Sequence, residues 1–260
     1  MKHRGLILIM PALLLAGCGG GEAAGPQELT VFAAASLTDA FHELANTFEA
    51  ENEGVEVLIN FAGSSQLAAQ LREGVDADVF ASANPKQMQV AMDAGRVAAG
   101  GSRLFVSNRL TVVVPADNPA EIGALEDLAQ PGVQLILAVP EVPVRAYTDD
   151  IVAAMDPNFQ AGFYANLVSE EDNVRQVAAK VALGEADAGI VYTSDVTPDI
   201  AGQMQLVPIP DAQNVIASYP IAPITDAQQP ELANRFIDFV LSNAGQAILA
   251  RWGFGPPPVN

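Results

Sequence analysis

The stretch that decides the fold is Val31–Asp39, VFAAASLTD, where an apolar strand runs through small residues into a helix. Apolar residues recur at helical spacing beyond it, so a helix begins near Ser36 and buries one face against the sheet. The first turn of a helix leaves N–H groups unpaired at its positive end, and the alanines allow close approach, so the junction suits a bound oxyanion. Taken alone, Ser36 or Thr38 is more simply explained as an N-cap, with Asp39 as a favourable first-turn acid.

The composition indicates a globular protein that is strongly acidic. The chain has 260 residues, half of them apolar, which is enough for a large buried core in one or two domains. Its formal net charge of -19 argues against duplex nucleic acid as a partner, because phosphate backbones are bound through clustered Lys and Arg. The same charge opposes long-range attraction of an anion, so an anion site must work through local donors at short range.

The N-terminus is typical of an exported lipoprotein. Basic residues at positions 2–4 precede the apolar stretch Leu6–Ala16, which is too short to span a bilayer permanently and predicts a signal peptide over residues 1–17. Leu15–Cys18, LAGC, resembles the bacterial lipoprotein box, and Cys18 is the only cysteine, so we expect lipid on Cys18. Residues 18–27 then form a flexible tether on the extracytoplasmic side of a membrane. A plain signal peptide without lipid is the alternative.

Strands alternate with helices from Glu28 onward, which predicts an α/β protein with mainly parallel sheets flanked by helices. The expected strands are Leu29–Ala33, Val55–Phe61, Ala77–Ser82, Leu110–Val114, Leu135–Val139, Ala188–Tyr192 and Ser218–Ile221. The expected helices are Leu37–Ala50, Ser65–Glu73, Pro85–Ala94, a segment near Leu125, Ala146–Met155, Val174–Leu183 and segments carrying Leu232 to Ile248.

These elements divide into two lobes. Lobe 1 comprises residues 28–109 and 219–260, and lobe 2 comprises residues 110–218. The chain crosses between the lobes twice, which makes a hinge. Ligands of open α/β sheets bind at the C-terminal ends of strands, so we expect the site in the cleft between the lobes.

Further junctions of strand and helix repeat the opening pattern. Asn60–Leu67 ends a strand in small and hydroxyl residues before an amphipathic helix, so Ser64 or Ser65 is a second candidate donor. The alternative is a serine N-cap, with Gly63 supplying the turn. In lobe 2 the corresponding junctions are Val139–Tyr147, Ser169–Arg175 and Gly189–Asp195, the last with Tyr192 at the strand tip.

Taken together, these junctions make the chain similar to the periplasmic molybdate-binding proteins of ABC transporters, in a lipoprotein form, within the type II periplasmic binding protein superfamily. The resemblance covers about residues 28–254 and rests on the order and spacing of short motifs. It implies a monomer of two lobes that closes around molybdate or tungstate, needs no cofactor and delivers the anion to an ABC permease. The motifs are Val31–Asp39 (VFAAASLTD), Phe61–Leu67 (FAGSSQL), Ala77–Ala83 (ADVFASA), Val142–Val144 (VPV), Asn173–Arg175 (NVR), Gly189–Asp195 (GIVYTSD) and Arg251–Phe254 (RWGF).

The resemblance also implies the ligand contacts, all of them neutral donors. Ser36 and Ser64 would donate through hydroxyl and backbone N–H. Val144 and Val174 would donate through backbone N–H, and Tyr192 through its phenol, unless that hydroxyl bonds the backbone instead. Molybdenum would be bound only as the oxyanion. Such a cavity would leave the proton of hydrogen phosphate unpaired, at a cost of roughly 1 to 3 kcal/mol, whereas sulfate has to be rejected by its smaller size.

Arg145 departs from the family pattern, which commonly has glycine at this position. Glycine suits a backbone that approaches a ligand closely or takes a positive φ. Because arginine is mostly exposed in proteins, we expect the Arg145 side chain in solvent. The alternatives are that it reaches the anion or closes the cleft.

Residues suited to catalysis are scarce. His3 lies in the predicted signal peptide and His42 on the polar face of a helix, so Ser36 has no evident base. The acidic run Glu170–Asp172 is better explained as complementing a helix dipole than as a metal site. We therefore expect a binding protein rather than an enzyme. The alternatives are a receptor of the same fold for another anion, such as sulfate or a small organic anion, a hydrolase or transferase that uses Ser36 as nucleophile, and a structural lipoprotein with an empty cleft.

Overall fold

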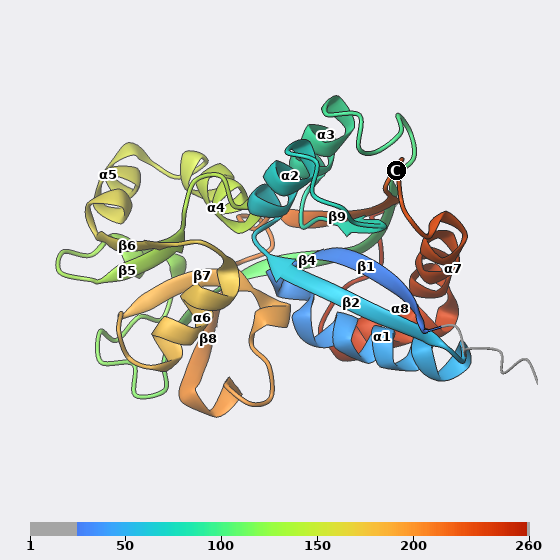
Figure 1. The fold of residues 1–260 in the computed structure, drawn as a ribbon. Coiled ribbons are helices and arrows are strands. Elements are labelled where there is room, and N and C mark those ends of the chain that lie inside the picture. Colours follow the sequence, from blue (N-terminus) through green and yellow to red (C-terminus); the bar gives the residue numbers. More distant parts are fainter. Residues whose placement is uncertain (1–24, 259–260) are drawn as a thin grey trace, which may run out of the picture.

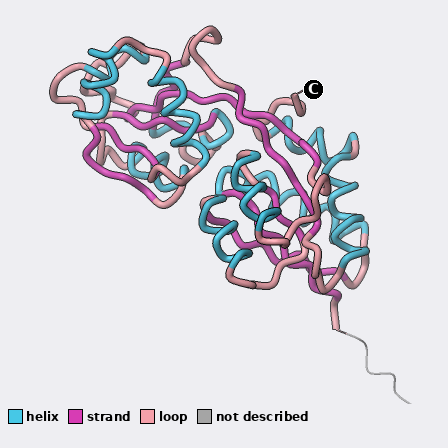
Figure 2. Tube along the Cα trace, turned by 90° about the horizontal axis from the view of Figure 1, so that it is seen from above, coloured by secondary structure: helices cyan, strands magenta, loops and turns pink. Residues whose placement is uncertain are grey.

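The computed structural model describes residues 25–258, so the predicted signal peptide and Cys18 lie outside the described residues. The fold consists of two α/β lobes side by side, with long strands running from one to the other (Figure 1, Figure 2). The predicted fold class and the two-lobed arrangement are confirmed. Within residues 25–258, no helix is both long and apolar enough to cross a membrane.

Lobe 1 combines the N-terminal and C-terminal parts of the chain. Its strands are β1 (Gln27–Ala34), β2 (Val55–Ala62), β3 (Val79–Ala81) and β9 (Ile216–Pro223), and its helices are η1 (Ala35–Leu37), α1 (Thr38–Glu51), α2 (Ser64–Arg72), α3 (Pro85–Asp93), α7 (Pro230–Leu241) and α8 (Asn243–Arg251). Strands β1, β2 and β3 are parallel, and β9 is antiparallel to β3. Buried Leu67 and Met88 pack α2 and α3 on one face of the sheet, while Phe41 and Phe236 pack α1 and α7 on the other.

Lobe 2 is the middle of the chain. Its strands are β5 (Leu135–Ala138), β6 (Leu167–Glu171), β7 (Ala188–Tyr192) and β8 (Met204–Pro208), and its helices are η2 (Leu125–Ala129), α4 (Pro143–Ala153), α5 (Pro157–Ala165), α6 (Val174–Ala182), η3 (Thr193–Asp195) and η4 (Ala201–Gln203). Strand β5 is parallel to both β6 and β7. Helix α5 was not predicted, and residues 169–171, which we expected to open a helix, are the end of β6.

One strand belongs to both lobes. Strand β4 (Arg103–Pro115) pairs with β9 along its first half and with β7 and β8 along its second half. The full order is β2-β1-β3-β9-β4-β7-β5-β6, with β8 also on β4. The sequence predicts only Leu110–Val114 as a strand, because the first half mixes exposed Arg103 and Arg109 with buried residues and lacks a continuous apolar run. The two lobes therefore meet along strands β4 and β9.

Candidate functional site

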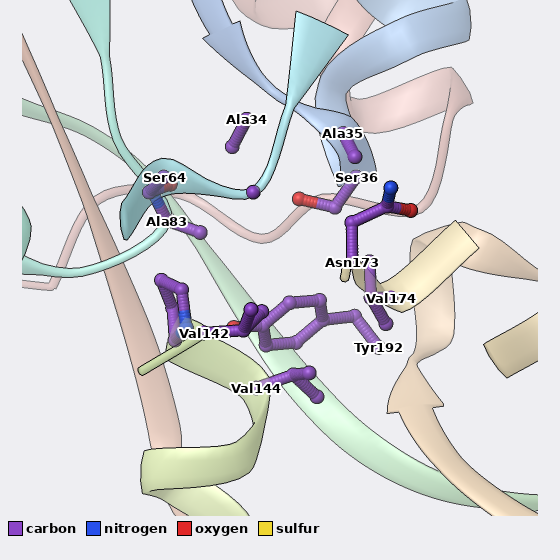
Figure 3. Close-up of a pocket in the computed structure, with 12 residues that line it drawn as sticks. Ala34, Ala35, Ser36, Ser64, Ala83, Val142, Val144, Asn173, Val174 and Tyr192 are labelled. Atoms are coloured by element: carbon purple, nitrogen blue, oxygen red, sulfur yellow. The ribbon is translucent and has the colours of Figure 1, made fainter. Parts of the chain in front are cut away.

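A cavity lies between the two lobes, where strands end and helices begin. The five predicted ligand residues all line it: Ser36 and Ser64 from lobe 1, and Val144, Val174 and Tyr192 from lobe 2 (Figure 3). The volume open to the centre of a water-sized sphere is about 10 Å³, so the cavity admits a small compact group and is too small for a larger organic ligand. The remaining lining residues, which the sequence did not single out as ligands, are Ala34, Ala35, Gly63, Ala83, Val142, Pro143 and Asn173. They lie at or next to strand ends and helix starts, and a search of these junctions in the sequence could have found them.

The wall from lobe 1 presents two serine hydroxyls that do not cap their own helices. The Ser36 hydroxyl lies 3.0 Å from the Tyr219 hydroxyl. Ser64 is the first residue of α2, and its Oγ accepts a hydrogen bond of 3.0 Å from the Ala83 N–H. Neither side chain caps a helix, and the hydroxyl of Thr38 donates backwards to Ala35 O. The capping interpretations of both junctions are therefore wrong.

The wall from lobe 2 consists of two helix N-termini. Val144 and Val174 lie in the first turns of α4 and α6, where backbone N–H groups have no hydrogen-bond acceptor within their own helix. In α4, backbone pairing begins with the Arg145 N–H, which donates to Val142 O at 3.0 Å. In α6, Asn173 caps the third N–H with its side chain at 3.1 Å, which leaves the Val174 N–H available. Both helix dipoles place their positive ends at the cavity.

Tyr192 supplies a buried hydroxyl that has no hydrogen-bond partner among residues 25–258. It is the last residue of β7 and is 1% exposed, and its ring extends across the cavity (Figure 3). The hydroxyl makes no hydrogen bond within the described part of the chain, so the alternative in which it bonds the backbone is wrong. Burial raises the pKa of Tyr192 well above its ordinary value, so the phenol keeps its proton and can donate. A buried hydroxyl without a partner costs free energy unless a ligand pairs with it.

Arg145 is buried, and the expectation that it lies in solvent is wrong. Only 7% of the residue is exposed, because its guanidinium pairs with Asp149 at 2.8 Å and Glu170 at 2.6 Å. It also donates to Ala138 O at 3.1 Å and lies 5.7 Å from the centre of the Tyr164 ring. The side chain does not line the cavity, so it neither reaches the ligand site nor closes it. Its backbone is helical, in α4, so this position needs no glycine.

Replacing Arg145 by alanine is expected to destabilise the fold without changing ligand affinity. The free energy of unfolding should fall by about 2 kcal/mol, because hydrogen bonds to charged groups contribute about 1.5–3 kcal/mol and the two carboxylates are partly screened by solvent. Urea unfolding and ligand titration measure the two effects. Arg72→Ala, at an exposed position on α2, is the matched control. A loss of affinity with unchanged stability would show that Arg145 acts on the ligand.

Polar contacts join the lobes around the cavity. The Gln87 side chain in lobe 1 donates to Glu141 O in lobe 2 at 3.0 Å. Arg175, next to Val174 on α6, reaches across to Asp39 on α1 at 2.7 Å. Its Nε also lies 2.9 Å from the fully buried Asp195, whose pKa burial raises to about 6 although Arg175 opposes the shift. The lobes are therefore in contact, and the structure represents a closed arrangement.

The other side chains considered for chemistry lie away from the cavity. His42 is exposed on α1, as predicted, with its ring 5.0 Å from that of Phe61. Glu170 and Glu171 lie in β6 and pair with Arg145 and Lys180, so their predicted role at a helix start is wrong. Among residues 25–258, no group of three or more His, Cys, Asp or Glu side chains is arranged to hold a metal ion.

Comparisons with known proteins agree with this geometry. The chain is 40% identical to the molybdate-binding protein ModA of Mycobacterium tuberculosis, over 97% of each chain. The solved substrate-binding domain of a putative molybdenum ABC transporter from Clostridium difficile is 27% identical, with a TM-score of 0.66, over 89% of this chain and 99% of that one. The sulfate-binding protein SubI of Mycobacterium tuberculosis shares the fold, with a TM-score of 0.74 and 22% identity over 88% of this chain and 87% of that one. Residues 29–255 match the family described as bacterial extracellular solute-binding protein, and the chain belongs to that family.

Proposed function

We propose that this protein is an extracytoplasmic receptor that captures molybdate, and also tungstate, and delivers it to an ABC permease. The observation that carries the proposal is the convergence of neutral donors on one small cavity between the lobes. Two serine hydroxyls, two helix N-termini and the unpartnered Tyr192 hydroxyl face the same space. A dehydrated tetrahedral dianion has four oxygens that need donors, and helix N-termini provide partial positive charge without a counter-ion. The name of the 40% identical relative points to the same ligand.

The donor set also accounts for selectivity. Hydrogen phosphate carries a proton that needs an acceptor, and a cavity lined by donors leaves it unpaired at a cost of roughly 1 to 3 kcal/mol. Sulfate carries no such proton and has to be distinguished by its smaller size, since longer bonds to the central atom bring the oxygens of molybdate closer to the walls. Tungstate is nearly the size of molybdate and is expected to bind as well.

Closure of the lobes is the proposed functional motion. Anion donors come from both lobes, so the full set assembles only when the lobes meet, as in hinge-type binding proteins. We further propose that lipid on Cys18 anchors the receptor to a membrane, that it acts as a monomer, and that it catalyses no reaction. In keeping with a binding role, the Ser36 hydroxyl is paired with Tyr219 rather than with a general base.

Titration calorimetry tests the proposal. The chain from residue 19 onward is titrated with molybdate, tungstate, sulfate, hydrogen phosphate and one small dicarboxylate. We expect tight binding of molybdate and tungstate, weaker binding of sulfate, and binding of hydrogen phosphate about ten- to a hundredfold weaker than that of molybdate. If sulfate or the dicarboxylate bound most tightly, the protein would still be a receptor, but molybdate would be the wrong ligand. Absence of heat with every anion would contradict the proposal altogether.

A further inference from the structure

Tyr219 lies directly behind the cavity wall. It is a residue of β9, fully buried, and its ring packs edge-on against Phe105, Tyr192 and Phe254. It does not line the cavity, so it is outside the set of ligand donors. Its hydroxyl lies 3.0 Å from the Ser36 hydroxyl, with both groups buried. Tyr219 therefore acts on the site only through its neighbours.

The surroundings favour one direction for this hydrogen bond. At 3.0 Å either hydroxyl could donate. The Tyr219 hydroxyl has two further polar neighbours: the Tyr192 hydroxyl, which retains its proton, and Asn108, whose Oδ1 already accepts from the Arg109 N–H at 2.9 Å and the Thr193 hydroxyl at 3.0 Å. The Asn108 amide nitrogen can only donate. Burial raises the pKa of Tyr219 well above its ordinary value, so its proton is retained, and Ser36 Oγ at 3.0 Å is the acceptor within hydrogen-bond distance.

Ser36 consequently has its own proton free for the cavity. Its oxygen is occupied from behind, and the side chain points into the cavity (Figure 3). Ser64 shows the same arrangement, because its Oγ accepts from the Ala83 N–H, which can only donate. Each serine thus receives one hydrogen bond from the protein and presents one donor to the ligand. The lobe 1 wall can then donate hydrogen bonds to an anion, but it has no free serine oxygen to accept a hydrogen bond from a protonated anion.

We propose that Tyr219 is a positioning residue that holds the Ser36 hydroxyl as a donor and thereby selects oxyanions without a proton over protonated ones such as hydrogen phosphate. This inference rests on the proposed function. It differs from that function in assigning part of the selectivity to a residue that does not touch the ligand. The Tyr219 hydroxyl donates to Ser36 as the Ala83 N–H donates to Ser64, and it adds no net charge to the site.

A double-mutant cycle tests the inference. Tyr219→Phe removes the donor and keeps the ring contacts, so the variant is expected to fold with nearly unchanged melting temperature. It should raise the dissociation constant for molybdate about three- to tenfold, but by less than about twofold when added to Ser36→Ala, since residues in one hydrogen-bonded unit are not additive. The ratio of the dissociation constant for hydrogen phosphate to that for molybdate should also fall, because the Ser36 oxygen is then free to accept the proton of hydrogen phosphate.

Tyr147→Phe is the matched control. The Tyr147 hydroxyl accepts from the Ser218 N–H, next to Tyr219 on β9, and its hydrogen bond does not involve Ser36. This variant is expected to leave the ratio between the two anions unchanged. The inference would be overturned if Tyr219→Phe raised the dissociation constant for molybdate equally in the unmodified protein and in Ser36→Ala. It would also be overturned if Tyr219→Phe left the ratio of the hydrogen phosphate and molybdate dissociation constants unchanged. Failure of the unmodified protein to bind molybdate would instead overturn the proposed function, so the two failures are distinguishable.

Discussion

The double variant Ser36→Ala with Ser64→Ala is expected to lose nearly all affinity for molybdate. Each hydroxyl donates to a doubly charged anion in a buried site, and each such hydrogen bond contributes about 1.5–3 kcal/mol, so the dissociation constant should rise by about two to four orders of magnitude. Calorimetry with molybdate measures this change. Both substitutions also leave a buried donor behind, the Tyr219 hydroxyl and the Ala83 N–H, so melting temperatures must be measured without ligand.

Three controls separate ligand contacts from general damage. Ser65→Ala removes the neighbouring hydroxyl on α2, which does not line the cavity, and should leave affinity unchanged. Val144→Ala and Val174→Ala keep the backbone N–H groups that are proposed to donate, so they should lower affinity little. If the valine variants abolished binding while the serine pair had no effect, the assignment of donors would be wrong.

The strongly acidic chain hosts an anion because the site uses dipoles rather than charges. The net charge of -19 is spread over the whole molecule, and salt screens such charges beyond about 10 Å. At the cavity, the N–H groups of α4 and α6 and the serine hydroxyls act within hydrogen-bond distance. The nearby cation, Arg175, is paired with Asp39 and Asp195 and contributes to holding the lobes together.

The fold was predictable where the residue pattern is local. The strand and helix at Val31–Asp39 follow from an apolar run and helical spacing, and residues 188–192 were predicted as a strand with the correct ends. The first half of β4 was not predictable in this way. Its residues are stabilised by pairing with β9, more than a hundred positions away in the chain, and such pairing leaves no periodic signal in the strand itself.

The site was predictable as a set of strand ends and helix starts, but the partners of each side chain were not. Arg145 illustrates the limit. Because arginine side chains are usually exposed, the sequence predicts this one in solvent. In the structure it forms ion pairs with Asp149, one helical turn later, and with Glu170 on strand β6. Tyr219 illustrates the opposite case, since nothing in the sequence distinguishes it from a core aromatic residue. The i,i+4 spacing of Arg145 and Asp149 could have indicated the first contact, whereas the contacts with Glu170 and between Tyr219 and Ser36 join distant segments.

Closure of the cleft should fail when a side chain is added at Gly63. A Cβ atom at this position would lie 2.7 Å from the Asp172 carbonyl oxygen of the opposite lobe and 3.4 Å from Val142 Cγ2. Gly63 has φ -57 and ψ 136, a conformation that any residue adopts, so the substitution strains neither α2 nor lobe 1 itself. The cost therefore appears only when the lobes meet. Gly63→Ala should raise the dissociation constant for molybdate about tenfold and Gly63→Val about a hundredfold, because binding is weakened in proportion to the lost population of the closed state.

Small-angle scattering distinguishes this effect from a loss of donors. At a molybdate concentration that saturates only the unmodified protein, that protein should contract as the lobes close, whereas Gly63→Val should keep the radius of gyration of its ligand-free form and contract only at about hundredfold higher anion. Gly202→Ala and Gly202→Val are matched controls, because a Cβ there meets no atom within 4 Å. Unchanged affinity in Gly63→Val would mean that the ligand is held without the approach of Asp172 to α2. The anion would then be bound by one lobe, and the contacts between Arg175 and Asp39 would serve stability alone.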